Sequence, residues 1–196
     1  MSKLALIIPF FISTISYCQE LSISSKVGIA RGETVDLKKI MFYSSVVGGI
    51  EFVSKKNIAF KAEIGVEQVS YDSYLWSAAS IFNRKNFITI PISIKKYYPL
   101  SKKSSGFWQF GTYASYLHRS TKEKVNMFAV SREIEKNLGA NIGVSCLFGF
   151  KTALTPSIKF DIAIGGQQDY VFIYKNISDK TKLRKTYMQF AFSKTL

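Results

Sequence analysis

The stretch that decides the fold is NLGANIGVSCLFGF at residues 137–150, where apolar side chains recur at every second position. Successive side chains of a β-strand point to opposite faces, so this alternation predicts a strand with one apolar face and one face of small or polar residues. A tilted strand crosses a bilayer in about 9–11 residues, so this segment is long enough to do so. Its apolar face comprises Leu138, Ala140, Ile142, Val144, Cys146, Phe148 and Phe150.

The same alternation recurs in seven further segments, at residues 21–30, 44–53, 58–71, 86–98, 106–118, 157–167 and 185–194. Alternate connections are short, at 54–57, 99–105 and 151–156, and the others are long and polar, at 31–43, 72–85, 119–136 and 168–184. Short turns on one rim and long loops on the other are typical of outer-membrane barrels. The sequence therefore predicts an all-β protein: an eight-stranded, antiparallel, up-and-down transmembrane β-barrel with short periplasmic turns and longer extracellular loops.

The volume of the interior decides which face of such a barrel points outward. Eight strands enclose a space that side chains just fill, and the Ile, Phe, Trp and Leu residues of all the segments would overcrowd it. We therefore expect the apolar face to meet lipid and the face of small residues to line the lumen. Charged residues also lie on that inner face, and we expect them to form a paired network that plugs the lumen. These residues are Lys26, Glu51, Lys61, Glu63, Glu67, Lys95, Lys159 and Asp161.

Residues 1–18 have the pattern of a secretory signal peptide, with Lys3 before an apolar run and a small-x-small site that ends at Cys18. This predicts export and a barrel domain at 19–196 in the outer membrane of a Gram-negative bacterium. A lipoprotein acylated on Cys18 is the alternative. Cleavage after Cys18 leaves Cys146 as the remaining cysteine, so no intrachain disulfide is expected. No later segment is apolar enough for a helical membrane span.

Two irregularities interrupt the pattern. Pro91 lies in the middle of a predicted strand, where it removes a ladder donor, and we expect a local bulge there. The apolar phase slips after Val66, at Gln68 and Val69, which predicts that this strand bulges or leaves the membrane at that point.

The segment ITIPISIKKYY at residues 88–98, the leader before Gln19 and the aromatic final strand resemble the PorT-like family of outer-membrane barrels. The chain also resembles, more loosely, the small OmpA/OmpX-type barrels. The final strand departs from the common pattern because it ends at Leu196 rather than at an aromatic residue. Most members of the family have no assigned activity, so the resemblance implies location and shape more than function. Our leading hypothesis is a structural or adhesive surface protein, which includes service as an accessory of a secretion or assembly machine.

The formal net charge is +14, and many of the basic residues lie in the long connections. On an exported barrel these cations would face the phosphates of lipopolysaccharide, or they would form a solvated loop surface. We expect outer-membrane lipid, lipopolysaccharide and a protein bound through the extracellular loops as partners, and no nucleic acid. The candidate lipopolysaccharide-facing residues are Arg84, Lys85, Lys122, Lys124, Lys175, Lys180, Lys182, Arg184 and Lys185.

His118 is the single histidine, and Ser120 follows two residues later. A His-x-Ser pair resembles the lipid A deacylase barrels, with Glu133 or Glu135 as the orienting acid, and this makes a lipid-modifying enzyme one alternative function. A secreted soluble barrel that binds a small apolar ligand is a second alternative. Without a metal cluster, a phosphate loop or a nucleotide motif, we expect a non-enzymatic protein with no catalytic residues, metal or cofactor.

Overall fold

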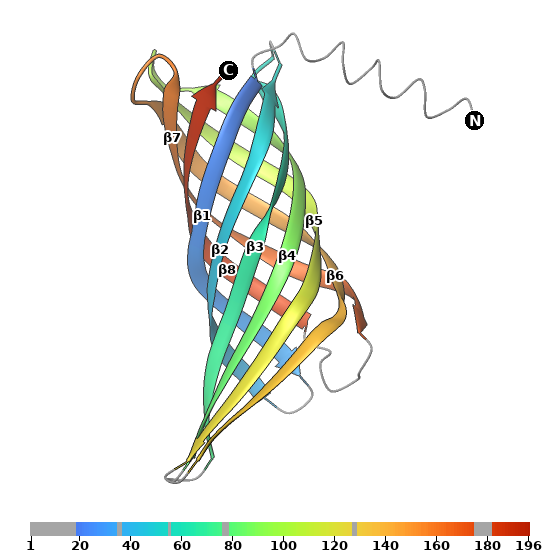
Figure 1. The fold of residues 1–196 in the computed structure, drawn as a ribbon. Helices are drawn as coiled ribbons and strands as arrows, with labels where there is room; N and C mark the ends of the chain where they lie inside the picture. Colours follow the sequence, from blue (N-terminus) through green and yellow to red (C-terminus); the bar gives the residue numbers. More distant parts are fainter. Residues whose placement is uncertain (1–18, 35–36, 55, 76–78, 127–128, 175–181) are drawn as a thin grey trace, which may run out of the picture.

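The computed structural model describes residues 19–34, 37–54, 56–75, 79–126, 129–174 and 182–196 (Figure 1). Within them no helix is long and apolar enough to cross a membrane. The predicted signal peptide at 1–18 lies outside the described residues. Eight strands form the molecule: β1 (Gln19–Thr34), β2 (Leu37–Val53), β3 (Ile58–Leu75), β4 (Ala79–Pro99), β5 (Ser104–Asn126), β6 (Val130–Ala153), β7 (Ile158–Tyr174) and β8 (Lys182–Thr195).

Each strand pairs antiparallel with the next, and β1 pairs with β8 to close the barrel. The closing ladder, which we call the seam, runs from Glu20 opposite Thr195 to Glu33 opposite Lys182. The predicted eight-stranded, antiparallel, up-and-down barrel is therefore confirmed. Short connections follow β2, β4 and β6, and Asn57 takes a positive φ of 59° in the first of them.

The segments predicted as long loops are mostly strand, which corrects that expectation. Strands β5 and β6 contain 23 and 24 residues, whereas β1 and β8 contain 16 and 14. As Figure 1 shows, β3 to β6 continue well past the rest of the wall and converge on a narrow tip. We call this part the extension and define it as residues 70–75, 79–86, 119–126 and 130–136.

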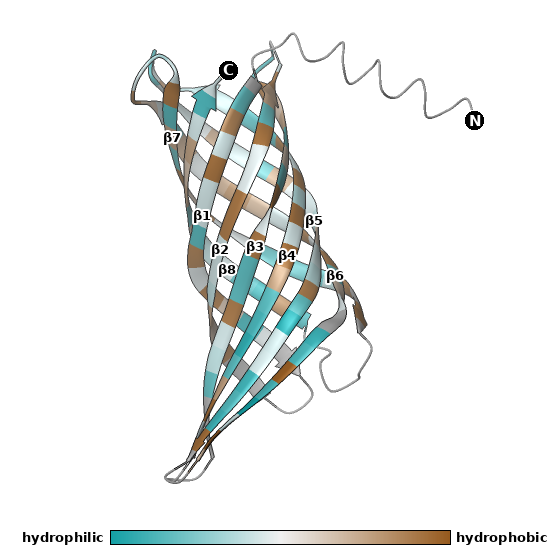
Figure 2. Cartoon of the chain, in the orientation of Figure 1, coloured by the Kyte–Doolittle hydropathy of each residue, from teal (hydrophilic) through white to brown (hydrophobic). Residues whose placement is uncertain are grey.

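Exposure follows the predicted alternation. The large apolar side chains of the wall point outward, as Ile64, Ile92 and Phe148 do with 61%, 44% and 60% of their surface exposed. Brown apolar bands accordingly lie along the strands in Figure 2. Charged and polar side chains are instead buried on the inner face, including Lys95 and Glu51. A soluble barrel with an apolar cavity does not fit this arrangement, so that alternative is wrong.

Neither predicted irregularity produces a bulge. Pro91 pairs with Tyr113 of β5 without a register shift. On its other side, the ladder with β3 passes from Ala62–Ile92 to Gly65–Thr89 in the same register. The missing donor thus interrupts pairing without moving the strand. After Val66 the side chains of β3 still alternate between the two faces. The apolar phase slips only because an apolar residue, Val69, takes an inner position, where it is fully buried.

A bulge occurs instead at His118. On β5, Leu117 pairs with Phe87 and Arg119 pairs with the adjacent Asn86, so one residue of β5 is extra. The same position shifts the register with β6. An inserted residue reverses which face each later side chain points to. Thus the faces of β5 beyond His118 are exchanged relative to the barrel below.

Candidate functional site

The inner face holds a nearly balanced set of charges. All eight predicted lumen residues lie on this face, and a further five join them. Together they make seven lysines and six carboxylates, most of them fully buried, with Lys159 only partly covered. The five additional residues are Glu20, Lys85, Lys151, Asp169 and Lys185.

The tier near the short-turn rim is the most densely connected. Lys151 Nζ donates to Glu20 at 2.5 Å and to Glu51 at 3.2 Å, and it lies 2.9 Å from the Tyr97 hydroxyl oxygen. Tyr97 also donates to Glu51, and Lys159 pairs with Glu20. These contacts join β1, β2, β4, β6 and β7 across the lumen, so the tier connects non-adjacent strands of the wall.

The next tier contains three further ion pairs, one of which joins Lys95 Nζ to Glu51 Oε2 of the rim tier at 3.6 Å. Lys95 Nζ lies 2.6 Å from Asp161 Oδ2, and it also lies 3.8 Å from the centroid of the Phe107 ring. Lys61 pairs with Glu63 at 2.7 Å. Lys26 contacts an aromatic face instead, with its Nζ 5.3 Å from the centroid of the Tyr187 ring. Each buried lysine named here therefore has a carboxylate or a π-system beside it, as burial of a charge requires.

The tier toward the extension is built around tyrosines. Lys185 Nζ lies 2.6 Å from Glu67 Oε2, and Tyr43 donates to the other oxygen of that carboxylate at 3.1 Å. Tyr113 donates to Asp169 Oδ1 at 2.5 Å, and Asn141 Nδ2 donates to Asp169 Oδ2 at 2.7 Å. Large aromatic side chains thus lie in the lumen between the ion pairs.

The sequence pattern did not predict the additional lumen residues because of where they lie in their strands. Lys151, Asp169 and Lys185 lie at or beyond the ends assigned to their strands, where polar residues on both faces hide the alternation. Counting every second position past those ends would have found them, because Lys185 is in phase with Tyr187, Gln189 and Ala191.

The predicted lipopolysaccharide-facing residues divide into four groups. Arg84 and Arg184 are exposed on the outer face, and Lys182 Nζ lies 6.0 Å from the exposed Tyr170 ring. Lys85 and Lys185 are buried inside the barrel, which corrects the expectation for both. Lys175 and Lys180 lie outside the described residues. Lys122 and Lys124 are exposed, but they pair with Asn83 and the buried Ile81, so the bulge at His118 places them on the inner side of the extension.

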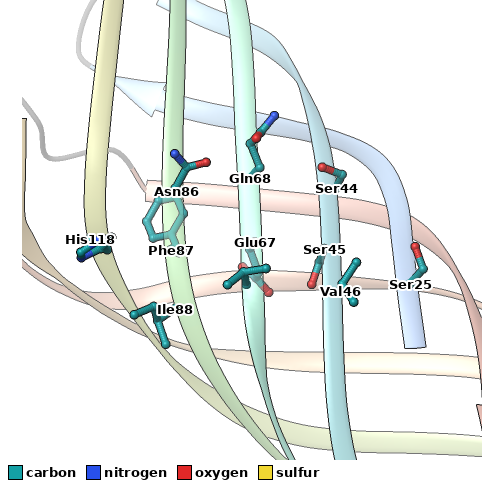
Figure 3. A pocket seen from close by; sticks show the side chains of 11 residues that line it. Ser25, Ser44, Ser45, Val46, Glu67, Gln68, Asn86, Phe87, Ile88 and His118 are labelled. Atoms are coloured by element: carbon teal, nitrogen blue, oxygen red, sulfur yellow. The ribbon is translucent and has the colours of Figure 1, made fainter. Parts of the chain in front are cut away.

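The bulge also separates the candidate catalytic pair. His118 points outward and lines a hollow of about 390 Å³ with Asn86 and Ile88 (Figure 3). Ser120 pairs with the buried Lys85 on one side and Glu135 on the other, so these residues share the opposite face. Residues i and i+2 of a regular strand would share a face, but the extra residue prevents it. The Ser120 hydroxyl therefore cannot transfer its proton to the His118 imidazole in this arrangement.

The part of the chain that the structure describes holds no group of three or more His, Cys, Asp or Glu side chains suited to a metal ion. Cys146, on β6, is a free thiol. Among the described residues, the buried ion pairs thus lie in the lumen, and the polar side chains of the outer face gather in the hollows near the extension.

No protein-family model matches the chain, and no curated protein sequence matches it. Solved structures share its fold, and two with a TM-score of 0.50 serve as examples. The crystal structure of Neisserial surface protein A (NspA) has a TM-score of 0.50 and 12% identity, over 90% of this chain and 97% of that chain. A major outer membrane protein from Thermus thermophilus has a TM-score of 0.50 and 9% identity, over 89% of this chain and 99% of that chain. The chain therefore has the fold of small outer-membrane β-barrels.

Proposed function

We propose that the protein is a non-enzymatic, integral outer-membrane β-barrel with a plugged lumen. One observation carries this proposal: the polarity of the molecule is inverted, with isoleucines and phenylalanines on the outside and lysine–carboxylate pairs inside. In water such a wall would expose a continuous apolar belt, whereas in a bilayer the same belt is solvated by lipid.

The direction of insertion follows from the two rims. Outer-membrane barrels keep short turns in the periplasm and send long hairpins outside. We therefore place the short connections and the β1–β8 chain ends in the periplasm and the extension at the cell surface, after export by a signal peptide at 1–18. An aromatic pair on the outer wall near the short turns supports a membrane interface at this rim. Trp108 Nε1 donates to the Tyr98 hydroxyl at 2.9 Å, and paired aromatic side chains with polar tips suit such an interface.

The plug rests on the three lumen tiers described above. Ion pairs such as Lys95–Asp161 and Lys185–Glu67 span the interior, and tyrosines occupy the space between them. Breaking one partner of a buried pair leaves an uncompensated charge, so the tiers resist opening. We accordingly assign the protein no channel function.

The extension is the feature best suited to contact with other molecules at the surface. Its exposed charged residues favour a structural or adhesive role, in which the outer wall meets lipopolysaccharide and the tip meets a partner. Service to a secretion or assembly machine belongs to the same non-enzymatic class. Lipid modification by His118 and Ser120 is disfavoured because the two residues lie on opposite faces.

Two measurements on one sample test the proposal. The chain folded in outer-membrane lipid should migrate differently in SDS before and after boiling, as closed barrels do, and should give no stepwise current in planar bilayers. The gel shift shows that the sample used for the current recording is folded. Stepwise currents from shifted protein would contradict the plug, and recovery of the protein from the soluble fraction without a shift would contradict the membrane assignment.

A further inference from the structure

The outer wall contains a basic hollow where the extension leaves the barrel. It encloses about 280 Å³ and is lined by arginines from three adjacent strands: Arg84 of β4, Arg119 of β5 and Arg132 of β6. We call it the arginine hollow. Its position depends on the bulge at His118, which turns Arg119 and Thr121 to the outer face beside Arg84.

The strand register places these side chains around Thr121. Thr121 pairs with Arg84 on one side and with Ile134 on the other, two residues from Arg132. Arg119 is two residues from Thr121 along the same strand and lies beside Lys136 of β6. Neighbouring like charges on one face of a sheet are unfavourable unless something neutralises them. The hollow thus gathers guanidinium groups that need an anion.

The charges of the hollow leave a positive surplus. Asp72 and Glu123 also line it, so three arginines face two carboxylates. Among the described residues none of the three arginines makes an ion pair. The Nε of Arg119 is buried there without a hydrogen-bond partner. A buried donor of this kind is costly unless the oxygen of a water molecule or of a ligand completes it, so the hollow offers a ligand oxygen a free donor.

An apolar surface adjoins the arginine hollow on the barrel side. The hollow in Figure 3 shares Gln68 and Asn86 with it and continues over Val46, Val66 and Ile88. These three side chains are 50%, 59% and 40% exposed on the wall. A molecule with an anionic head and an apolar tail would match both parts at once, whereas a free inorganic anion would use only the first.

We infer that the arginine hollow binds the phosphoryl group of an outer-leaflet lipid, with an acyl chain lying over Val66 and Ile88. Arginine suits this task because its planar fork donates two parallel hydrogen bonds to phosphate oxygens, and the Thr121 hydroxyl adds a further donor. The inference rests on the proposed function, since it requires the apolar wall to lie in the outer membrane.

The test counts lipid bound to the full-length barrel by native mass spectrometry in a neutral detergent. The probes are bisphosphorylated lipid A, the same lipid without its phosphates, and inorganic phosphate. We expect lipid A to be retained, and the triple variant Arg84→Gln/Arg119→Gln/Arg132→Gln to retain it at least about tenfold less well. The matched control Lys56→Gln/Lys96→Gln/Lys194→Gln removes the same charge at the short-turn rim and should retain lipid A like the unaltered protein.

Several results would overturn the inference. Equal loss in the arginine and lysine variants would show a general charge effect, and equal retention of the dephosphorylated lipid would show that the phosphates are not recognised. Complete displacement of lipid A by inorganic phosphate at equal concentration would identify a free-anion site instead. If the triple variant does not fold, Arg119→Gln alone replaces it and should still weaken retention. Insertion into liposomes is scored separately: a barrel that does not insert refutes the proposed function, whereas one that inserts without retaining lipid A refutes the inference alone.

Discussion

At the scale of single residues, glycines on the inner face make room for large side chains from neighbouring strands. A Cβ atom added to Gly143 would lie 2.5 Å from both Cζ and Oη of Tyr113. Tyr113 uses that space to reach Asp169. The alternation predicts that Gly143 points inward, but it does not reveal which side chain of another strand covers it, because that depends on barrel register.

Gly143→Ala should therefore destabilise the barrel by about 1–3 kcal/mol, since overpacking forces the Tyr113 ring away from Asp169. The measurement is the midpoint of urea unfolding in lipid vesicles, followed by the gel shift. Gly48→Ala is the control, because the nearest atom to its added Cβ is 3.9 Å away. Equal midpoints for the two variants would show that Tyr113 is loosely packed.

At the scale of strands, the sequence predicts the number, order and facing of all eight, because a bilayer demands strict contrast between the two faces. Their ends are predicted poorly. Beyond the apolar belt both faces of β5 are polar, so neither the continuation to Asn126 nor the bulge at His118 leaves a signal in hydropathy. The assignment of Lys185 to lipopolysaccharide fails for this reason, as does the pairing of His118 with Ser120.

The β5–β6 tip of the extension should be dispensable for folding of the barrel. Replacing residues 123–132 by an Asn-Gly turn keeps Lys122 opposite Glu133 and joins β5 to β6 as a tight hairpin. Since the lumen tiers lie below this point, we expect the midpoint of the heat-induced gel shift to change by less than about 4 °C. Deleting Thr112 and Tyr113 of β5 is the control and should abolish the shift. Loss of the shift in the hairpin variant would make the extension part of the folding unit.

At the scale of the whole molecule, the outer wall and the lumen have opposite polarity. Apolar residues face outward and charges are paired inside, so one strand carries both patterns on alternate positions. Lys95 and Ile94 are adjacent in the chain, yet Lys95 is fully buried and Ile94 is 52% exposed. Alternation predicts this division, but the partner of each lumen charge depends on contacts between distant strands.

Ile92→Lys should cost about 2–4 kcal/mol, because Ile92 is exposed in the middle of the β4 wall and a lysine there would meet lipid. Ile92→Leu should be nearly neutral. Refolding from urea into vesicles provides the unfolding free energies of both variants. Closely similar values for lysine and leucine would mean that water, rather than hydrocarbon, surrounds this part of the barrel.

The seam between β1 and β8 has a consequence for how the chain folds. Seven of the eight ladders join consecutive strands, whereas the seam joins residues as distant as Glu20 and Thr195. Local hairpins form faster than contacts of such long sequence separation, so the seam should close last. Until then the nascent sheet keeps two unpaired edges that can pair with other chains, so a chaperone that covers those edges should raise the yield of folded barrel.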